Sequence, residues 1–294
     1  MVRDGWQFTA PPFAGGTEPA VFHPGAPQDE ALARLEWLLA ERQRLGLVVG
    51  EDGVGKSAVL AMARRRLGGL GCEVALLSLG GLGDDDWLEL LLDRLPLEPE
   101  ARAEPSRPWR KLEDRLHENL LMERTTVIAC DDAERAPTAA LEGLARLVTA
   151  AEPCFGRVLV VLATTPAGLE RLPPALRHRA AVRIELAPWD EADVAAFLAG
   201  ALTRVGGDPA IFSPAAVATL WRFTGGVPGT VRRVASLALV AADAEGADRI
   251  AAATVERVWR ELVPDGAHAP RATDAGGGDP APGSGFRVVR RLGD

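Results

Sequence analysis

Short apolar runs alternate with longer stretches of helix periodicity along the chain as far as Ala187. The apolar runs predict buried strands at 45–49, 73–79, 126–130, 157–163 and 181–186. Apolar residues at helix spacing predict helices between them, at 28–44, 57–67, 84–95, 109–123 and after Asp132 as far as about Ala150. Strands that alternate with helices favour an α/β fold, in which helices cover both faces of a parallel sheet.

The pattern changes after Pro188, where helix periodicity continues without strand-like runs. It predicts helices at 190–203, 214–223, 228–243 and 252–262. Ser213 before Pro214 is a typical helix start, because serine can cap the first turn and proline fits the first helical position. We therefore expect an α/β domain over 28–187 and a small all-helical domain over 188–263.

Both ends of the chain depart from this pattern. Residues 1–27 are rich in Pro and Gly with scattered aromatic residues, and we expect an irregular arm that packs on the domain. Residues 264–294 are expected to form a disordered tail, since most of them are Pro, Gly, Ala and Asp and bury too little apolar surface to fold. The final peptide from Phe286 is basic and apolar, and it is interpreted either as a docking motif or as a plain tail.

Composition and charge narrow the class of protein. The 294 residues carry 33 basic and 41 acidic side chains, and the net charge of −8 gives no strong nucleic-acid signal. We find no signal peptide and no run of the roughly 18 apolar residues that a membrane helix needs, so we expect a cytoplasmic protein without direct membrane insertion. Cys72, Cys130 and Cys154 match no metal-binding spacing and are expected to be buried thiols.

A phosphate-binding motif follows the first predicted strand. The stretch Gly50-x₄-Gly55-Lys56-Ser57 comes after an apolar strand and opens a helix, as a P-loop must. In such a loop successive backbone N–H groups point at phosphate, the lysine reaches the β- and γ-phosphates, and the serine hydroxyl coordinates Mg²⁺. The lysine is informative because Lys56 and Lys111 are the only lysines of the chain. We expect ATP with Mg²⁺ to be held by Gly50, Glu51, Asp52, Gly53, Val54, Gly55, Lys56, Ser57 and Ala58.

The next two predicted strands end in residues that suit nucleotide hydrolysis. The strand at 126–130 ends in Asp131 and Asp132, a Walker B arrangement in which Asp131 holds Mg²⁺ through water and Asp132 orients the attacking water. Asp132 is one methylene shorter than the usual glutamate, and its alternative role is a helix cap. Thr165 follows the next strand, where it either contacts the γ-phosphate or attacking water, or forms the turn before Pro166.

Together these motifs resemble the AAA+ ATPases, and among them the general secretion pathway A-type ATPases. The resemblance covers about residues 6–262 and depends on the order and spacing of motifs that are individually unspecific. The motifs are Pro12-Phe13, Glu30–Leu35, the P-loop, Val127–Glu134, Leu162–Leu169, Leu176–Ala180, Leu186–Asp193 and Gly225–Arg232. The resemblance implies a parallel-sheet P-loop (AAA+) core followed by a small all-helical lid domain, with ATP bound by an oligomer.

The resemblance also assigns arginines to the site. Gly229 stands where the lid arginine is usual, so either Arg232 or Arg233 reaches the phosphates from one helical turn further on, or neither does and hydrolysis is weakened. Arg177 and Arg179 are the candidate arginine fingers that contact the nucleotide of a neighbouring subunit. Their alternative role is that of surface arginines at a helix end.

Three functions are compatible with these features. The first is an oligomeric ATPase that remodels a partner in secretion or cell-envelope assembly, with a membrane or secretion-system protein as that partner. The second is an ATP-dependent switch or scaffold that hydrolyses slowly or not at all, which the short acid at Asp132 and the glycine at Gly229 favour. The third is a DNA-transposition-type helper, against which the acidic charge argues.

Overall fold

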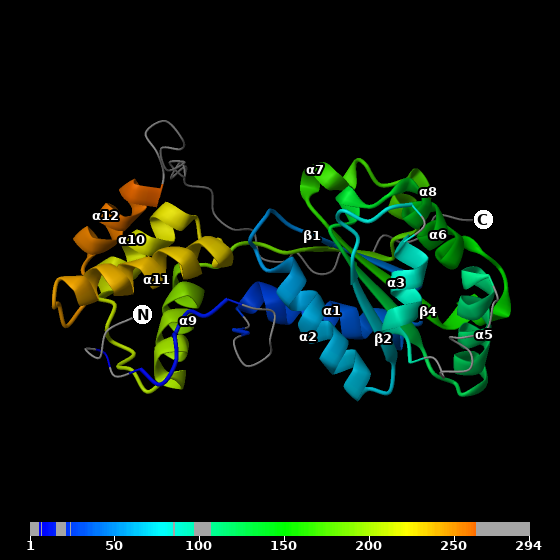
Figure 1. Ribbon diagram of the computed structural model, residues 1–294, viewed down its shortest axis with the longest axis horizontal. Helices are drawn as coiled ribbons and strands as arrows, with labels where there is room; N and C mark the ends of the chain where they lie inside the picture. Colours follow the sequence, from blue (N-terminus) through cyan, green and yellow to red (C-terminus); the bar gives the residue numbers. More distant parts are fainter. Residues whose placement is uncertain are drawn as a thin grey trace, which may run out of the picture.

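A five-stranded parallel sheet forms the centre of the first domain (Figure 1). The computed structural model describes Trp6 and residues 8–15, 22–23, 25–84, 86–96 and 107–262. The strand order is β2-β3-β4-β1-β5, and every neighbouring pair is parallel. The strands are β1 (Leu45–Val49), β2 (Glu73–Ser78), β3 (Thr126–Asp131), β4 (Val158–Thr164) and β5 (Val182–Glu185). The predicted α/β class is confirmed, and all carboxyl ends of the strands meet at one edge.

Helices cover both faces of this sheet, because side chains along each strand alternate between the faces. In β1, Leu47 and Val49 pack with one cluster and Val48 packs with another. The first cluster takes in α3 (Asp86–Arg94), α5 (Pro108–Leu121) and α6 (Thr138–Thr149), and the second takes in α1 (Ala26–Ala40) and α2 (Lys56–Gly69). β1 and β4 are buried along their whole length, which explains why their sequences are continuous apolar runs.

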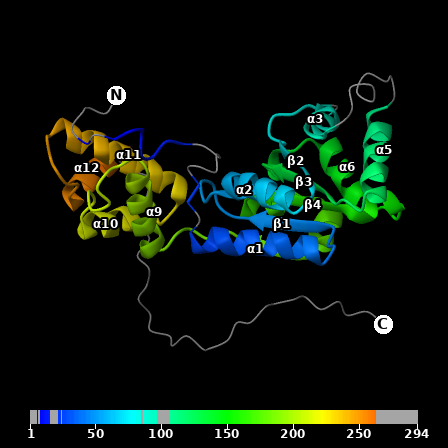
Figure 2. The same ribbon diagram turned by 90° about the horizontal axis from the view of Figure 1, so that it is seen from below.

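Four further helices pack around a separate core to one side of the sheet and form the lid (Figure 1 and Figure 2). They are α9 (Glu191–Arg204), α10 (Pro214–Thr224), α11 (Pro228–Ala244) and α12 (Ala252–Leu262). Phe13 from the N-terminal arm enters this core, with its ring 5.7 Å from that of Phe197 and 6.0 Å from that of Phe212. The described part of the arm therefore packs on the lid.

The expected element boundaries differ from the structure at a few places. The helix expected after Asp132 begins only at Thr138, since a short 3₁₀ turn, η1 (Ala133–Arg135), and Pro137 come between. Three short helical segments were not predicted: η2 (Pro153–Arg157), α7 (Pro166–Leu169) and α8 (Pro174–Arg179). The expected loop residues 97–106 and the tail at 264–294 lie outside the described residues.

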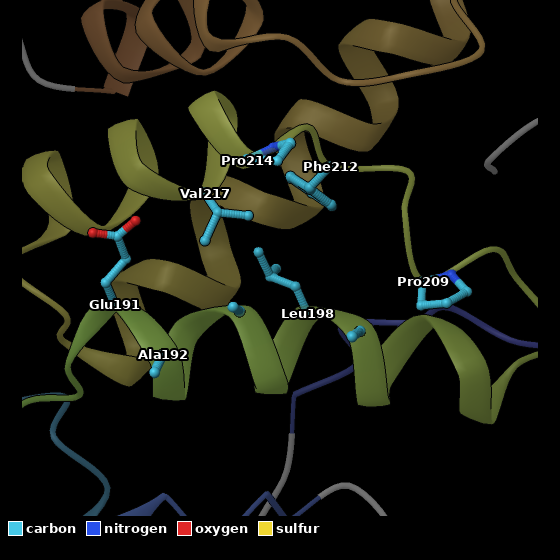
Figure 3. A pocket seen from close by; sticks show the side chains of 9 residues that line it. Glu191, Ala192, Leu198, Pro209, Phe212, Pro214 and Val217 are labelled. Atoms are coloured by element: carbon cyan, nitrogen blue, oxygen red, sulfur yellow. The ribbon is translucent and has the colours of Figure 1, made fainter.

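The lid also carries an apolar cavity of about 540 Å³ between α9 and α10. Leu198 and Val217 point toward one another across it, and no P-loop residue lines it (Figure 3). Among the described helices none is long and apolar enough to cross a membrane. The three cysteines are free thiols; Cys130 and Cys154 are buried as expected, whereas Cys72 is only partly buried. Burial raises the pKa of each thiol.

Candidate nucleotide-binding site

The P-loop connects the end of β1 to the first turn of α2, and its glycines stand where a side chain cannot. Gly53 and Gly55 have φ angles of 82° and 103°, in the left-handed region that glycine adopts without strain. A Cβ atom on Gly50 would lie 2.8 Å from Val54 Cγ2 and 2.9 Å from the Leu186 carbonyl oxygen. The sequence motif therefore reflects a close approach of backbone to backbone as well as the turn itself.

Lys56 folds back over this loop. Its Nζ donates hydrogen bonds to the carbonyl oxygens of Gly50 (2.8 Å) and Glu51 (3.1 Å), and lies 3.7 Å from Asp52 Oδ1. Only 8% of Lys56 is exposed. A buried ammonium held at the loop is available to a phosphate, because the carbonyl contacts can be exchanged for charge-assisted bonds.

Ser57 and Asp131 come together although they lie on different elements. The Ser57 side chain lies close enough to the Asp131 carboxylate to lower the pKa of Asp131 as a hydrogen-bond donor. Asp131 Oδ1 also accepts a hydrogen bond from the Asp132 N–H at 3.0 Å. Burial raises the pKa of Asp131, against the opposing effect of Ser57. A hydroxyl beside a carboxylate is an oxygen donor set that fits Mg²⁺, directly or through water. The predicted pairing of these two residues is thus compatible with the structure, while metal binding itself stays a prediction.

Asp132 is turned toward the end of β2. Its backbone is left-handed, with φ 54° and ψ 40°, and Ser78 Oγ donates a 3.1 Å hydrogen bond to Asp132 Oδ2. Sequence reasoning did not find Ser78, because a single serine at the end of a strand carries no signal by itself. Asp132 is the N-cap residue of η1, but its side chain makes no hydrogen bond to that turn. The alternative role of Asp132 as a helix cap therefore has no side-chain bond to support it.

The two threonines at the end of β4, Thr164 in the strand and Thr165 after it, have different surroundings. Thr165 Oγ accepts a 2.9 Å hydrogen bond from the Gly168 N–H and so caps α7. Thr164 is fully buried, and its carbonyl accepts from the Gly50 N–H at 3.1 Å. Thr164 therefore lies against the base of the P-loop, whereas the Thr165 hydroxyl is engaged in the turn. A contact of Thr165 with the nucleotide stays a prediction.

Arg179 lies at the opposite edge of the sheet from the P-loop. It ends α8, and two residues later the Ala181 N–H donates to the carbonyl of Leu45, the first residue of β1. Burial and the nearby Arg179 charge both lower the pKa of Arg44, which places the two arginines close together. Since the P-loop follows the last residue of β1, Arg179 is separated by the length of a strand from the P-loop of the same chain.

Arg177 and Arg232, the other two arginines assigned to the site, have different surroundings. Arg177 Nε is buried without a hydrogen-bond partner. Arg232 lies against the arm, since a Cβ atom on Gly15 would be 3.1 Å from Arg232 Nη1. Their predicted roles as finger and phosphate ligand remain predictions.

The lid touches the P-loop directly at Gly229. The Gly229 N–H donates a 2.9 Å hydrogen bond to the Gly53 carbonyl, and a Cβ atom on Gly229 would lie 3.2 Å from that oxygen. Gly229, which stands where the lid arginine is usual, thus contacts the P-loop through its backbone and not through a charged side chain. A second link runs through Gln28 and Trp189. The sequence included Trp189 only as part of the segment Leu186–Asp193 and gave neither residue a role at the P-loop.

Comparison with known proteins agrees with this geometry. Residues 39–172 match a family described as AAA domain. General secretion pathway protein A of Aeromonas hydrophila is 29% identical over 245 residues, which are 82% of this chain and 44% of that protein. The chain therefore spans less than half the length of that relative.

Solved structures with the same fold share little sequence with this chain. The Drosophila ORC bound to DNA has a TM-score of 0.63 at 16% identity, covering 85% of this chain and 64% of that one. The Aeropyrum pernix ORC2 protein, solved with ADPNP and ADP, has a TM-score of 0.58 at 13% identity, covering 80% and 66%. At these identities the likeness concerns the fold alone.

Proposed function

Since the chain carries an AAA-type P-loop domain and resembles General secretion pathway protein A, we propose that it is a Mg²⁺-dependent ATPase that works as an oligomer. ATP binding and hydrolysis would shift the lid against the sheet domain and so remodel a protein partner. The likeness to a protein named for secretion supports a partner in secretion or the cell envelope, met from the cytoplasmic side.

One observation carries this proposal: the ammonium of Lys56, the hydroxyl of Ser57 and the carboxylate of Asp131 converge at the carboxyl edge of the sheet. Lys56 is held on the loop carbonyls, and the Ser57 side chain lies beside the Asp131 carboxylate. Lysine neutralises phosphate charge, and the two oxygen donors suit the metal that accompanies ATP. The first turn of α2 adds the backbone N–H groups and the positive end of its dipole.

Calorimetric titration with ATP and Mg²⁺ tests the assignment. Lys56→Met keeps most of the side-chain stem but removes charge-assisted bonds to phosphate, so affinity should fall by about two orders of magnitude. Lys111→Met is the matched control, because it removes the other lysine, on α5, and should leave affinity unchanged. Equal ATP affinity of the wild type and Lys56→Met would contradict the assignment of these residues as a P-loop.

A second candidate function, a slow ATP-dependent switch, is favoured by two contacts of the site. The Asp132 carboxylate is bonded to Ser78, and Gly229 presents no side chain to the loop. Both features weaken hydrolysis more than binding, because they concern groups that act on the attacking water and on transition-state charge. Steady-state turnover measured over a range of protein concentrations separates the two: a brisk rate in the dilute monomer contradicts both the switch and a finger from a neighbour.

The partner can be tested without knowing its name. The chain, immobilised with ATP and Mg²⁺, should retain envelope proteins from solubilised membranes of its own cell, and Lys56→Met should not. Retention of the same proteins by both, or of none by either, contradicts nucleotide-dependent remodelling of an envelope partner.

A further inference from the structure

Gln28 lies between the P-loop and the lid and bonds to both. Its Nε2 donates a 3.2 Å hydrogen bond to the Val54 carbonyl, and its Oε1 accepts a 2.8 Å bond from Trp189 Nε1. Only 2% of Gln28 is exposed. Because water cannot replace either partner at so buried a site, neither the loop nor the lid can move alone without leaving a polar group unpaired.

The bond to Val54 orients the peptide that leads into Gly55. In a planar trans peptide the carbonyl and the following N–H point in opposite directions. With the Val54 oxygen turned to Gln28, the Gly55 N–H faces away from Gln28. Gly55 is the N-cap of α2, the position at which backbone N–H groups receive phosphate. The amide of Gln28 thus fixes the direction of one of the donors of the phosphate cradle.

At its other end the bridge enters the lid through Trp189. The Trp189 N–H donates to the Gly226 carbonyl at 2.9 Å, and its own carbonyl accepts from Trp221 Nε1 at 3.2 Å. Its ring lies 5.0 Å from that of Phe197. Trp189 is therefore bonded or packed to α9, to α10 and to the turn that leads into α11.

The surrounding backbone is shaped to leave room for this bridge. A Cβ atom on Gly25 would lie 2.5 Å from Trp189 Nε1 and 2.9 Å from Gln28 Oε1. The hydrogen bond from the Gly229 N–H to the Gly53 carbonyl is a second link between the lid and the P-loop. Two successive P-loop carbonyls, those of Gly53 and Val54, are thus linked to the lid. The loop and the lid are thus coupled by two hydrogen-bonded routes.

We infer that Gln28 is a positioning residue that sets the phosphate-binding conformation of the P-loop and transmits nucleotide binding to the lid through Trp189. The inference rests on the proposed function, because it needs ATP at the P-loop. The inference adds Gln28, a residue outside the P-loop and Walker B motifs, to the nucleotide-binding site. It also names the contact between Gln28 and Trp189 as the place where the lid movement begins.

Two variants break the bridge at different points. Gln28→Met removes both bonds with little change of volume, and ATP affinity should fall about tenfold, the effect of one lost hydrogen bond. Trp189→Phe removes the indole N–H donor together with part of the ring, but it leaves the bond from Gln28 to Val54. Affinity should therefore change less than threefold. Gln43→Met is the control, since the Gln43 side chain donates its hydrogen bond to the nearby Glu41 carbonyl and not to the P-loop or the lid.

The indole N–H resonances of the protein report the signal that reaches the lid. In a ¹H–¹⁵N spectrum the Trp189 and Trp221 peaks are identified by their loss in Trp189→Phe and Trp221→Phe. Saturating ATP with Mg²⁺ should shift both peaks in the wild type and in Gln43→Met. In Gln28→Met the Trp221 shift should fall below half of the wild-type value, and so should that in Trp189→Phe.

The outcomes separate this inference from the proposed function. A wild type that binds no ATP overturns the proposed function. A wild type that binds ATP while Trp189 and Trp221 stay unshifted overturns the inference alone, and this result needs no variant to fold. The inference is also overturned if Gln28→Met shows both the wild-type ATP affinity and the wild-type Trp221 shift. If Gln28→Met does not fold, a wild-type Trp221 shift in Trp189→Phe overturns it instead.

Discussion

The hydroxyl of Ser78 donates a 3.1 Å hydrogen bond to Asp132 Oδ2 and so links the end of β2 to the residue that follows β3. The two strands are neighbours in register, with Ser78 opposite Asp131. Asp132 has φ 54°, a conformation that Asp and Asn tolerate better than other non-glycine residues. The carboxylate expected to orient the attacking water is therefore held by a neighbouring strand in this structure.

Asp132→Asn tests whether that carboxylate takes part in hydrolysis. Asparagine suits the left-handed backbone and can still accept the Ser78 hydrogen bond, so the fold and ATP affinity should be preserved. Turnover should fall about tenfold or more, because the charge that polarises water is lost. Rates from a coupled phosphate-release assay, with Ser78→Ala measured beside it, provide the check. An unchanged rate in Asp132→Asn would assign Asp132 to the turn alone.

Asp131→Asn should separate metal binding from stability. Burial disfavours the ionised carboxylate and raises the pKa of Asp131, so a neutral amide should leave the melting temperature of the nucleotide-free protein equal or higher. The gain in ATP affinity that Mg²⁺ provides should disappear, since the carboxylate is the charged metal donor. Thermal melting and calorimetry with and without Mg²⁺ measure the two effects. A sharp fall in melting temperature with unchanged Mg²⁺ dependence would show a structural residue.

Arg179 should act on the nucleotide of a neighbouring subunit, because it lies at the edge of the sheet opposite the P-loop. Arg179→Ala and Lys56→Met should each lower turnover to near background, the loss of a finger being worth about a thousandfold. Mixed together they should recover activity, since one variant supplies the arginine and the other the P-loop. Arg171→Ala, a nearby exposed arginine, serves as the control. A mixture no faster than the sum of its parts contradicts action between subunits.

Two adjacent glycines before α11 should differ in their tolerance of alanine. Gly225 and Gly226 have φ angles of 59° and 70°. A Cβ atom on Gly225 would meet nothing within 4 Å, whereas a Cβ atom on Gly226 would lie 1.9 Å from the Trp189 carbonyl oxygen. Gly225→Ala should reduce the free energy of unfolding by about 1 kcal/mol through backbone strain alone. Gly226→Ala should reduce it by about 2–5 kcal/mol, because steric overlap is added. Urea unfolding of the pair measures the difference, and equal losses would contradict the close contact at Trp189.

His23 should make the stability of the protein depend on pH. Its ring lies 5.8 Å from that of Trp189, and burial lowers its pKa below the ordinary 6.5, with Arg204 acting in the same direction and Asp193 and Asp29 opposing. A lowered folded pKa means that stability is fully present above about pH 6.5 and is lost as the pH falls through the folded pKa. His23→Phe keeps an aromatic ring and should flatten this part of the curve of melting temperature against pH. Parallel curves for the two proteins would show that His23 contributes nothing to it.

The sequence by itself determined the elements and the P-loop, because these depend on neighbours along the chain. An apolar run of 45–49 forms a buried strand in any parallel sheet, and Gly53 and Gly55 allow the turn that leads into α2. The lid helices likewise follow from their periodicity, within a residue or two of the expected bounds. Where short segments and proline compete, as after Asp132, periodicity placed the helix start too early.

Only the tertiary structure decided which of these residues meet. The strand order brings Ser78 to Asp132, and it separates Arg179 from its own P-loop by the length of β1. Gln28 and Trp189 are 161 positions apart, and their bond exists because the lid returns to the start of α1. Such contacts leave no periodic trace, since they depend on how whole elements pack and not on the spacing of residues within one element.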